Sequence, residues 1–150
     1  MLYSYDESMY ADYIRLCYNL LKESSYRDSE FYEYKLKELV DNKMTCCYLY
    51  KSDGIFKGFI LGHLSTCLWN NDIAAEEVFL YVEPVIRGSS AAIKLIYQFE
   101  TWAKENKAKI VRIGQSSSVD IEKTAKFYKK LGYEITGCTT RKEIRHECSN

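Results

Sequence analysis

The chain is 150 residues long, which suffices for one α/β domain with its own core and is too short for two domains of ordinary size. Lysine plus arginine (21) balance aspartate plus glutamate (21), so overall charge does not draw the chain to nucleic acid or to an anionic membrane. Hydrophobic residues make up 47% of the chain and charged residues 28%, which excludes disordered and collagen-like proteins; tyrosine, with 14 copies, is overrepresented.

The six cysteines indicate neither a disulfide framework nor a zinc site. They form no Cys-x-x-Cys pair, Cys46 and Cys47 are adjacent, and two histidines are the only further soft ligands. The first residues lack the basic and then apolar pattern of a secretory signal, and no stretch is apolar for long enough to span a bilayer. We therefore expect a reduced, cytoplasmic protein that holds no metal.

Two helices and a β-hairpin are expected in the first half of the chain. Apolar residues recur at helical spacing over residues 6–23 and 29–41. The pattern then changes to strands at residues 44–51 and 55–68, joined by the turn Ser52-Asp53-Gly54. Glycines 58 and 62 lie inside the second strand and predict a bend or the close packing of another segment.

The second half alternates strands and helices. We expect a strand, a helix, a short strand, a helix and a final strand or hairpin at residues 73–82, 89–106, 109–113, 120–131 and 133–144. A β-meander followed by this alternation predicts an α/β (α+β) fold in which a mixed sheet carries helices on its faces. The two crossover helices begin at the same edge of the sheet, where ligands are expected.

Residues 82–92, Val-Glu-Pro-Val-Ile-Arg-Gly-Ser-Ser-Ala-Ala, carry the strongest chemical signal. A strand ends there, and a run of small residues opens an apolar helix. Small side chains let an anion approach the free N–H groups of a helix start, whose partial positive charge suits a pyrophosphate. Arg87 and the hydroxyls of Ser89 and Ser90 can add hydrogen bonds. The alternative is an ordinary helix start with serine caps. The run matches neither a Walker loop nor a dinucleotide fingerprint.

With the rest of the chain, this run resembles a known motif. FLYVEPVIRGSSAAIKLI (79–96) is similar to the acyl-CoA-binding motif of the GNAT superfamily of N-acetyltransferases, Val-x-Pro-x-x-Arg-Gly-x-Gly-x-Gly/Ala, and AKFYKKLGYE (125–134) resembles the family's second signature. The resemblance covers about residues 40–145. It implies a GNAT-like, mostly antiparallel sheet with a splayed central strand pair and helices on both faces. A subgroup of small phage and prophage acetyltransferases looks similar.

The resemblance implies acetyl-CoA as cosubstrate, without a metal, and a cofactor site around the end of one strand. The backbone of Val82 would pair with the pantetheine arm, and the following turn would surround the pyrophosphate. The implied cofactor residues are Leu80, Tyr81, Val82, Arg87, Gly88, Ser89, Ser90, Ala91, Ala92 and Glu122. Ser90 stands where the family has its central glycine, and Glu122 where an asparagine is frequent. These departures support the alternative of a GNAT-fold binding or inhibitor protein without turnover.

Three residues are candidates for proton transfer. Tyr128 matches the tyrosine that, in many family members, protonates the leaving thiolate; a phenol with a pKa of about 10 can do so, and the alternative is that Tyr128 only packs. Family members place on the strand before the turn a glutamate that takes a proton from the attacking ammonium, and Glu76 and Glu77 both qualify. Successive strand residues point to opposite faces, but a bulge would break that rule, so the choice stays open. Either glutamate could equally be a solvated strand residue.

The acceptor is the least determined part of the site. Residues 1–34 hold seven acidic and three basic residues and eight of the tyrosines, whereas residues 104–145 hold eleven basic and five acidic residues. The resemblance implies that the leading helices and residues 69–72 shape the acceptor site. An acidic, aromatic surface favours a cationic small amine, a protein lysine or N-terminus, or an amine-bearing modified base. Nucleic-acid binding through residues 104–145 is a weaker alternative, since these cations can also serve the phosphates of CoA. A homodimer on the C-terminal strands is an arrangement that such folds adopt.

Overall fold

The computed structural model describes residues 1–114 and 120–145. The chain divides into two compact units, Met1–Val119 and Asp120–Asn150. Among the helices of the described residues, none is both long and apolar enough to cross a membrane.

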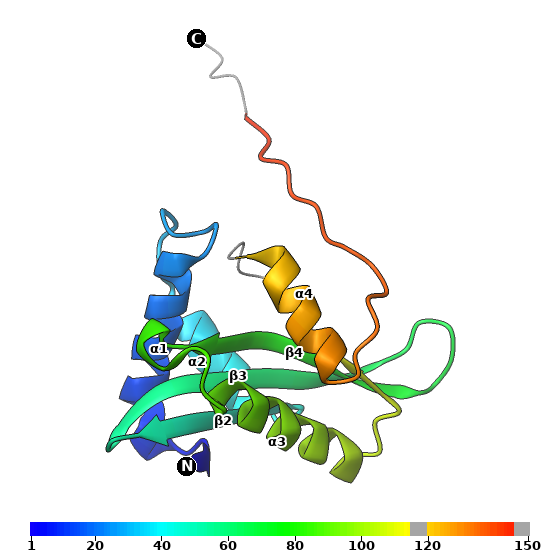
Figure 1. Cartoon of the computed structure of the whole chain (residues 1–150), viewed down its shortest axis with the longest axis horizontal. Coiled ribbons are helices and arrows are strands. Elements are labelled where there is room, and N and C mark those ends of the chain that lie inside the picture. The colour runs from blue at the N-terminus through cyan, green and yellow to red at the C-terminus, as the bar shows by residue number, and fades with distance from the viewer. Residues whose placement is uncertain (115–119, 146–150) are drawn as a thin grey trace. The chain divides into compact units, whose positions relative to one another are not determined.

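A mixed sheet forms the centre of the first unit (Figure 1). In the described part of the chain its strand order is β1-β2-β3-β4-β5. The strands are β1 (Leu2–Ser4), β2 (Thr45–Ser52), β3 (Ile55–Thr66), β4 (Ile73–Val82) and β5 (Ile110–Arg112). Neighbouring strands from β1 to β4 are antiparallel, and β5 runs parallel to β4. The predicted mixed, mostly antiparallel sheet is confirmed.

The hairpin between β2 and β3 follows from its turn residues. Asp53 (φ 53°) and Gly54 (φ 78°) both have positive φ. This backbone matches the right-handed twist of the flanking strands, and aspartate and glycine are the residues that tolerate it best. The short strand β1, which pairs with β2, was not predicted, because three residues are too few to show a strand period.

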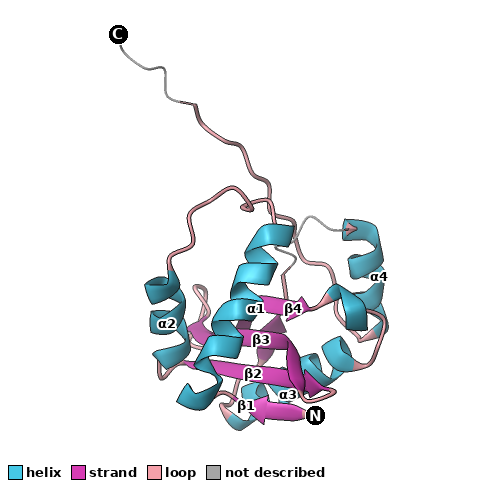
Figure 2. Ribbon diagram, turned by 90° about the vertical axis from the view of Figure 1, so that its left-hand side faces the viewer, coloured by secondary structure: helices cyan, strands magenta, loops and turns pink. Residues whose placement is uncertain are grey.

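Helices cover both faces of the sheet, as predicted (Figure 2). On one face lie α1 (Tyr10–Glu23), after a short 3-10 turn, and α2 (Glu33–Asp41); on the other lies α3 (Ala91–Glu105). The core under α1 combines the apolar face of this helix with inward strand residues and contains Tyr13, Leu16, Cys17, Leu20, Cys47, Leu49, Phe56, Phe59, Leu61 and Tyr81. The core under α3 includes Ile60, Ala75, Val82, Leu95, Phe99 and Ala103.

Strand β4 contains a bulge at the point where it separates from β5. Its register against β3 pairs Leu61 with Phe79 but Gly62 with Glu77, so Val78 is an extra residue. Strand β5 pairs with β4 only along residues 74–76, although β4 continues to Val82. Pairing between the two strands therefore ends next to the bulge, where β5 itself ends at Arg112; the predicted splay of the strand pair falls at this point.

Helix α3 packs closely against the sheet at Gly62. A Cβ atom at Gly62 would lie 2.2 Å from Cε2 of the fully buried Phe99 and 3.1 Å from the backbone oxygen of Glu76. We expect Gly62→Ala to lower the free energy of unfolding by about 1–3 kcal/mol, because the ring must leave its packed position. Urea denaturation measures this loss. Gly137→Ala is the control, since nothing lies within 4 Å of a Cβ there; equal effects of the two substitutions would contradict the close packing at Gly62.

The second unit contains α4 (Ile121–Lys130). The Asp120 carboxylate caps this helix by accepting a hydrogen bond from the Lys123 N–H at 3.1 Å. Gly132, with a φ of 90°, follows its end. The prediction of a strand or hairpin at residues 133–144 is wrong, because these residues form no strand. Their few apolar side chains, among them Ile135 and Ile144, are exposed, so they provide no continuous face that a strand could bury.

Candidate active site

The turn after β4 redirects the chain from the sheet into α3. A short 3-10 helix (Pro84–Ile86) follows the strand, and the Glu83 N–H donates to the Lys57 carbonyl at 2.8 Å. Gly88 then adopts a φ of 85°, with no atom within 4 Å of where a Cβ would stand. This conformation favours glycine, and the open space leaves the backbone accessible to a ligand.

Several backbone N–H groups of this turn are available to an anion. The Ser89 N–H donates to the Ile86 carbonyl, and the Ser89 hydroxyl accepts from the Ala91 N–H at 3.2 Å. The N–H groups of Gly88, Ser90 and Ala92 make no hydrogen bond to another residue that the structure describes. Because they lie at the positive end of α3, they can bind a phosphate. Ser90, which stands where the family motif has its central glycine, leaves this row of donors in place.

Arg87 is engaged within the protein. Its Nη2 pairs with the Glu23 carboxylate at the end of α1, and its Nε donates to the Val82 carbonyl at 2.9 Å. Its guanidinium carbon also lies 5.7 Å from the centre of the Tyr81 ring. The Arg87 side chain, which was predicted to bind the pyrophosphate, is therefore folded back onto the end of β4, where the Glu23 carboxylate holds it.

The two adjacent glutamates of β4 have different surroundings. Glu76 lies 2.7 Å from Arg112 and 3.4 Å from His63, so side chains of both neighbouring strands hold its carboxylate. Glu77 accepts a hydrogen bond from the Gly114 N–H at 3.1 Å. Burial raises the pKa of Glu77 to about 7, because this one N–H only partly offsets the loss of water around the carboxylate.

Glu77 lies at the separation of β4 and β5. It is the first residue of β4 beyond the pairing with β5, and it stands next to the bulge residue Val78. Its carboxylate reaches the backbone just past the end of β5, at Gly114. The surroundings of the two glutamates therefore differ: Glu77 lies next to the bulge with a raised pKa, whereas Arg112 and His63 hold the Glu76 carboxylate.

The side chains of Leu80, Tyr81 and Val82, which precede the turn, pack in the core, so these residues can offer a ligand mainly their backbone. Tyr81 and Val82 are buried in opposite faces of the sheet, and Leu80 packs against the core under α3. The Tyr81 hydroxyl donates to Glu23 at 2.8 Å. Burial and the neighbouring Glu23 carboxylate raise the pKa of Tyr81, so its hydroxyl stays protonated.

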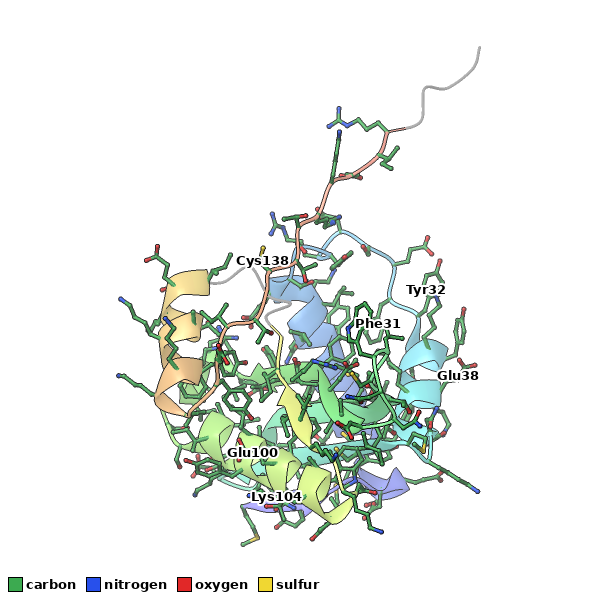
Figure 3. All side chains as sticks on the ribbon, turned by 90° about the vertical axis from the view of Figure 1, so that its right-hand side faces the viewer. Phe31, Tyr32, Glu38, Glu100, Lys104 and Cys138 are labelled. Carbon is green, nitrogen blue, oxygen red and sulfur yellow. The ribbon has the colours of Figure 1, made fainter. Side chains whose placement is uncertain are left out.

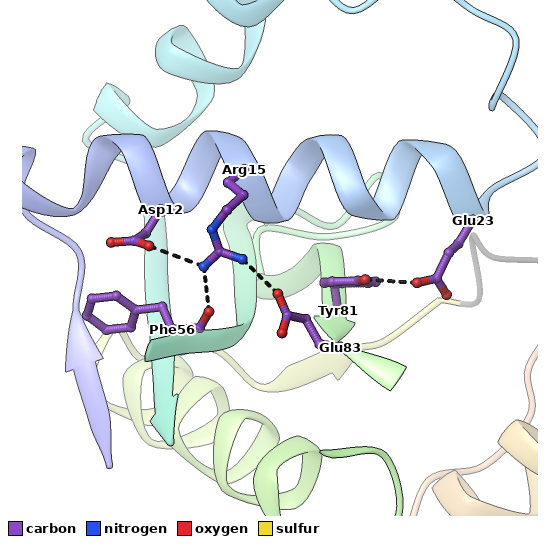
Figure 4. Close-up of polar contacts among 6 residues, drawn as sticks. All are labelled: Asp12, Arg15, Glu23, Phe56, Tyr81 and Glu83. Carbon is purple, nitrogen blue, oxygen red and sulfur yellow. Dashed lines mark hydrogen bonds and ion pairs between the residues drawn. The ribbon is translucent and has the colours of Figure 1, made fainter. Parts of the chain in front are cut away.

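An open pocket of about 420 Å³ adjoins these residues on the α1 side of the sheet. It is lined by Asn19, Lys22, Glu23, Tyr81, Glu83, Pro84 and Val85. Two ties fix α1 beside it (Figure 4): Arg15 binds Glu83 at 2.7 Å and the Phe56 carbonyl at 2.6 Å, and Glu23 binds Tyr81.

Neither the contacts of Arg15 nor those of Glu23 were predicted, although the position of Glu23 in the sequence indicated that it has a partner. An acidic residue in the last turn of a helix is unfavourable there, because the helix dipole is negative at that end, and this indicates a compensating partner.

The predicted acceptor segments are exposed. Tyr18, Tyr26, Tyr32 and Tyr34 remain about half exposed around the connection from α1 to α2, and Tyr32 and Glu38 lie at the same side of the first unit (Figure 3). In the loop between β3 and β4, Trp69 is 93% exposed. These aromatic and acidic side chains can contact a cation.

Tyr128 and Glu122 lie together on α4, in the second unit. Glu122 is in the first turn, where its charge favours the helix dipole. The Tyr128 ring lies 5.5 Å from that of Phe127 and 5.9 Å from that of Tyr133, measured between ring centres. The remaining predicted site residues belong to the first unit.

Comparisons with known proteins agree with this arrangement. The model of the acetyltransferase (GNAT) family matches residues 7–133. The solved structure of an aminoglycoside N-acetyltransferase, AAC(6')-Iy, in complex with CoA is similar with a TM-score of 0.75, at 14% identity over 97% of this chain and 100% of that one. The enzyme AAC(6')-IG from Acinetobacter haemolyticus gives a TM-score of 0.74, at 19% identity over 98% of this chain and 99% of that one.

A structure described as a transcriptional regulator from Bacillus halodurans C-125 is also similar, with a TM-score of 0.78 at 14% identity over 96% of this chain and 99% of that one. No curated protein matches the chain in sequence. At these identities the solved structures show a common fold. Since the family model spans most of the sequence, the chain belongs to the GNAT family of acetyltransferases.

Proposed function

We propose that the protein transfers the acetyl group of acetyl-CoA to a primary amine by direct attack in a ternary complex. The observation that carries this proposal is the Glu77 carboxyl, which has a pKa raised to about 7 and lies where β4 and β5 part. The turn whose N–H groups are unpaired comes directly after β4. The segment from Glu77 to Ala92 therefore carries a base at one end and an anion site at the other.

Glu77 is assigned the role of base. A carboxylate with a pKa near 7 is ionised in about half of the molecules at neutral pH and can take a proton from an ammonium, directly or through a water. The neutral amine then attacks the thioester carbonyl; the C–N bond forms, the C–S bond breaks, and the nitrogen releases its second proton to solvent as it becomes an amide. Glu76 has no part in this step, because its carboxylate is held by Arg112 and His63.

Two further groups complete the proposed mechanism. A backbone N–H near Val82 would stabilise the developing oxyanion, as donors aimed at the transition state do. Tyr128 would give its phenolic proton to the departing CoA thiolate. This role for Tyr128 rests on its match to the family signature.

The proposed acceptor is a cationic amine. The exposed tyrosines around α2 offer faces for cation–π contact. The open pocket beside Tyr81 is lined by Lys22 and by two glutamates, Glu23 and Glu83, that pair with Arg87 and Arg15. Among similar folds, one structure is named an aminoglycoside acetyltransferase and another a ribosomal-protein-alanine N-acetyltransferase, so small amines and protein amines both belong in the acceptor screen.

Binding of acetyl-CoA is the first test. We expect heat in a calorimetric titration and a rise in melting temperature of about 5–10 °C at a ligand concentration one hundred times the Kd. Absence of both at millimolar acetyl-CoA would overturn the proposal. A mass-spectrometric screen of amines for a mass gain of one acetyl group then identifies the acceptor. Binding without any acetylated product would favour a GNAT-fold binding protein, the reading that Ser90 and Glu122 support.

A further inference from the structure

One carboxylate joins α1 to the turn that follows β4. Glu23 is the last residue of α1; its Oε1 accepts a hydrogen bond from the Tyr81 hydroxyl at 2.8 Å, and its Oε2 pairs with Nη2 of Arg87. Tyr81 is only 5% exposed, so its hydroxyl fixes the carboxylate in one place. The arginine expected to meet the pyrophosphate is therefore neutralised by an internal anion.

We infer that Glu23 sets the affinity for CoA by competing with its pyrophosphate for Arg87; this inference rests on the proposed function. In the protein without CoA, the Glu23 carboxylate takes the place of the phosphate anion. When CoA binds, Arg87 donates to phosphate oxygens instead, and Glu23 keeps its hydrogen bond from Tyr81.

The geometry favours exchange over permanent pairing. The side chains of Arg87 and Glu23 are 42% and 28% exposed, and an ion pair that water reaches is weak and easily replaced. A phosphate offers several charged oxygens that guanidinium N–H groups can bind in parallel. The bond from the Arg87 Nε to the Val82 carbonyl does not involve Glu23, so this side of the guanidinium can stay in place while Nη2 changes its partner.

The exchange also links the cofactor to the acceptor. Glu23 lines the open pocket beside α1. Once Arg87 binds the phosphate, the negative charge of Glu23 is no longer compensated by the guanidinium. The pocket then attracts a cationic amine more strongly than it does in the protein without CoA. Glu83, on the same wall, remains paired with Arg15.

The test is the CoA affinity of Glu23→Gln. The amide oxygen still accepts the Tyr81 hydrogen bond, so the tie to α1 is kept while the charge on Arg87's partner is lost. By calorimetry at low salt we expect the Kd for CoA to fall about two- to five-fold, the range for an exposed ion pair, and the gain to shrink at high salt. Glu83→Gln is the matched control: it neutralises a carboxylate of the same pocket and should leave the Kd unchanged.

A second pair of variants separates this role from a structural one. In an Arg87→Gln background, Glu23→Gln should no longer change the Kd, because the competition needs the guanidinium. An unchanged or raised Kd in Glu23→Gln, or an equal gain without Arg87, would overturn the inference while leaving the proposed function intact. If the wild-type protein bound no CoA, the proposed function and this inference would both be overturned.

Discussion

Replacing Glu77 with glutamine is expected to lower kcat about 100-fold or more, because the variant keeps the shape of the side chain but has no carboxylate to accept a proton. The KM for acetyl-CoA should change little, since the unpaired N–H groups of the turn are untouched. The measurement is release of the CoA thiol with an acceptor from the mass-spectrometric screen. Glu76→Gln, one residue away on the same strand, is the control and should retain most of the activity.

The pH profile tests the same assignment independently. With a pKa of about 7, Glu77 is protonated and inactive as a base below neutrality and ionised above it. The wild-type rate should therefore rise with pH and level off above pH 7, and this limb should be absent in Glu77→Gln. A Glu77 variant that kept the wild-type profile would exclude this residue as the base.

The raised pKa also predicts an effect on stability. The folded pKa lies above the ordinary value of 4.5, so the stabilising contribution of the protonated carboxyl is complete below pH 4.5 and is lost as the pH rises through 7. Between pH 5 and pH 8 the wild-type protein should lose on the order of 2 kcal/mol of unfolding free energy through this group. Urea denaturation of Glu77→Gln should show this loss removed. Above pH 7, where the wild-type protein is most active, the loss through this group should therefore be present in the wild-type protein and absent in the variant.

The elements with a long, uninterrupted pattern could be predicted from the sequence. Strand β4 begins and ends at the predicted residues, because its apolar and β-branched run stops before Pro84. Helix α3 lies inside its predicted range for the same reason. Helix α2 begins at Glu33 instead of Ser29, and the residue before it, Tyr32, has an extended backbone. The prediction of a final strand at residues 133–144 was wrong, because isolated apolar residues at strand spacing form no buried face unless another segment covers them.

The position of the turn in the candidate site could be predicted from the sequence, but the partners of its charged side chains could not. The motif located the turn at Gly88, because small residues after a strand are a local signal. The difference between the two glutamates depends on residues far along the chain, namely the His63 and Arg112 side chains and the Gly114 N–H. The bulge at Val78 also removes the alternation by which a strand pattern assigns faces. The pairing of Arg87 with Glu23 joins residues 64 positions apart and leaves no local pattern.

Tyr128→Phe should separate proton donation from cofactor binding. The substitution removes only the hydroxyl, and the ring can keep its contacts with Phe127 and Tyr133, so α4 should remain folded. A phenol with a pKa of about 10 can protonate a departing thiolate at neutral pH, and loss of a positioned acid costs at least about 100-fold in rate. We therefore expect kcat to fall by about that factor and the calorimetric Kd for CoA to stay within about two-fold of the wild-type value.

Tyr133→Phe is the matched control, because it removes a hydroxyl from the other member of the same ring pair. Wild-type turnover in Tyr128→Phe would leave the thiolate to be protonated by water and would remove Tyr128 from the acid role. A parallel loss of CoA affinity would mean that the hydroxyl binds the cofactor, since a group that acts only in the transition state changes kcat without changing the ground-state Kd. Equal losses in the Tyr128 and Tyr133 variants would point instead to the packing of the ring pair. Only a fall in kcat confined to Tyr128→Phe supports the proposed route, in which Glu77 takes the proton of the amine and Tyr128 supplies the proton of the thiol.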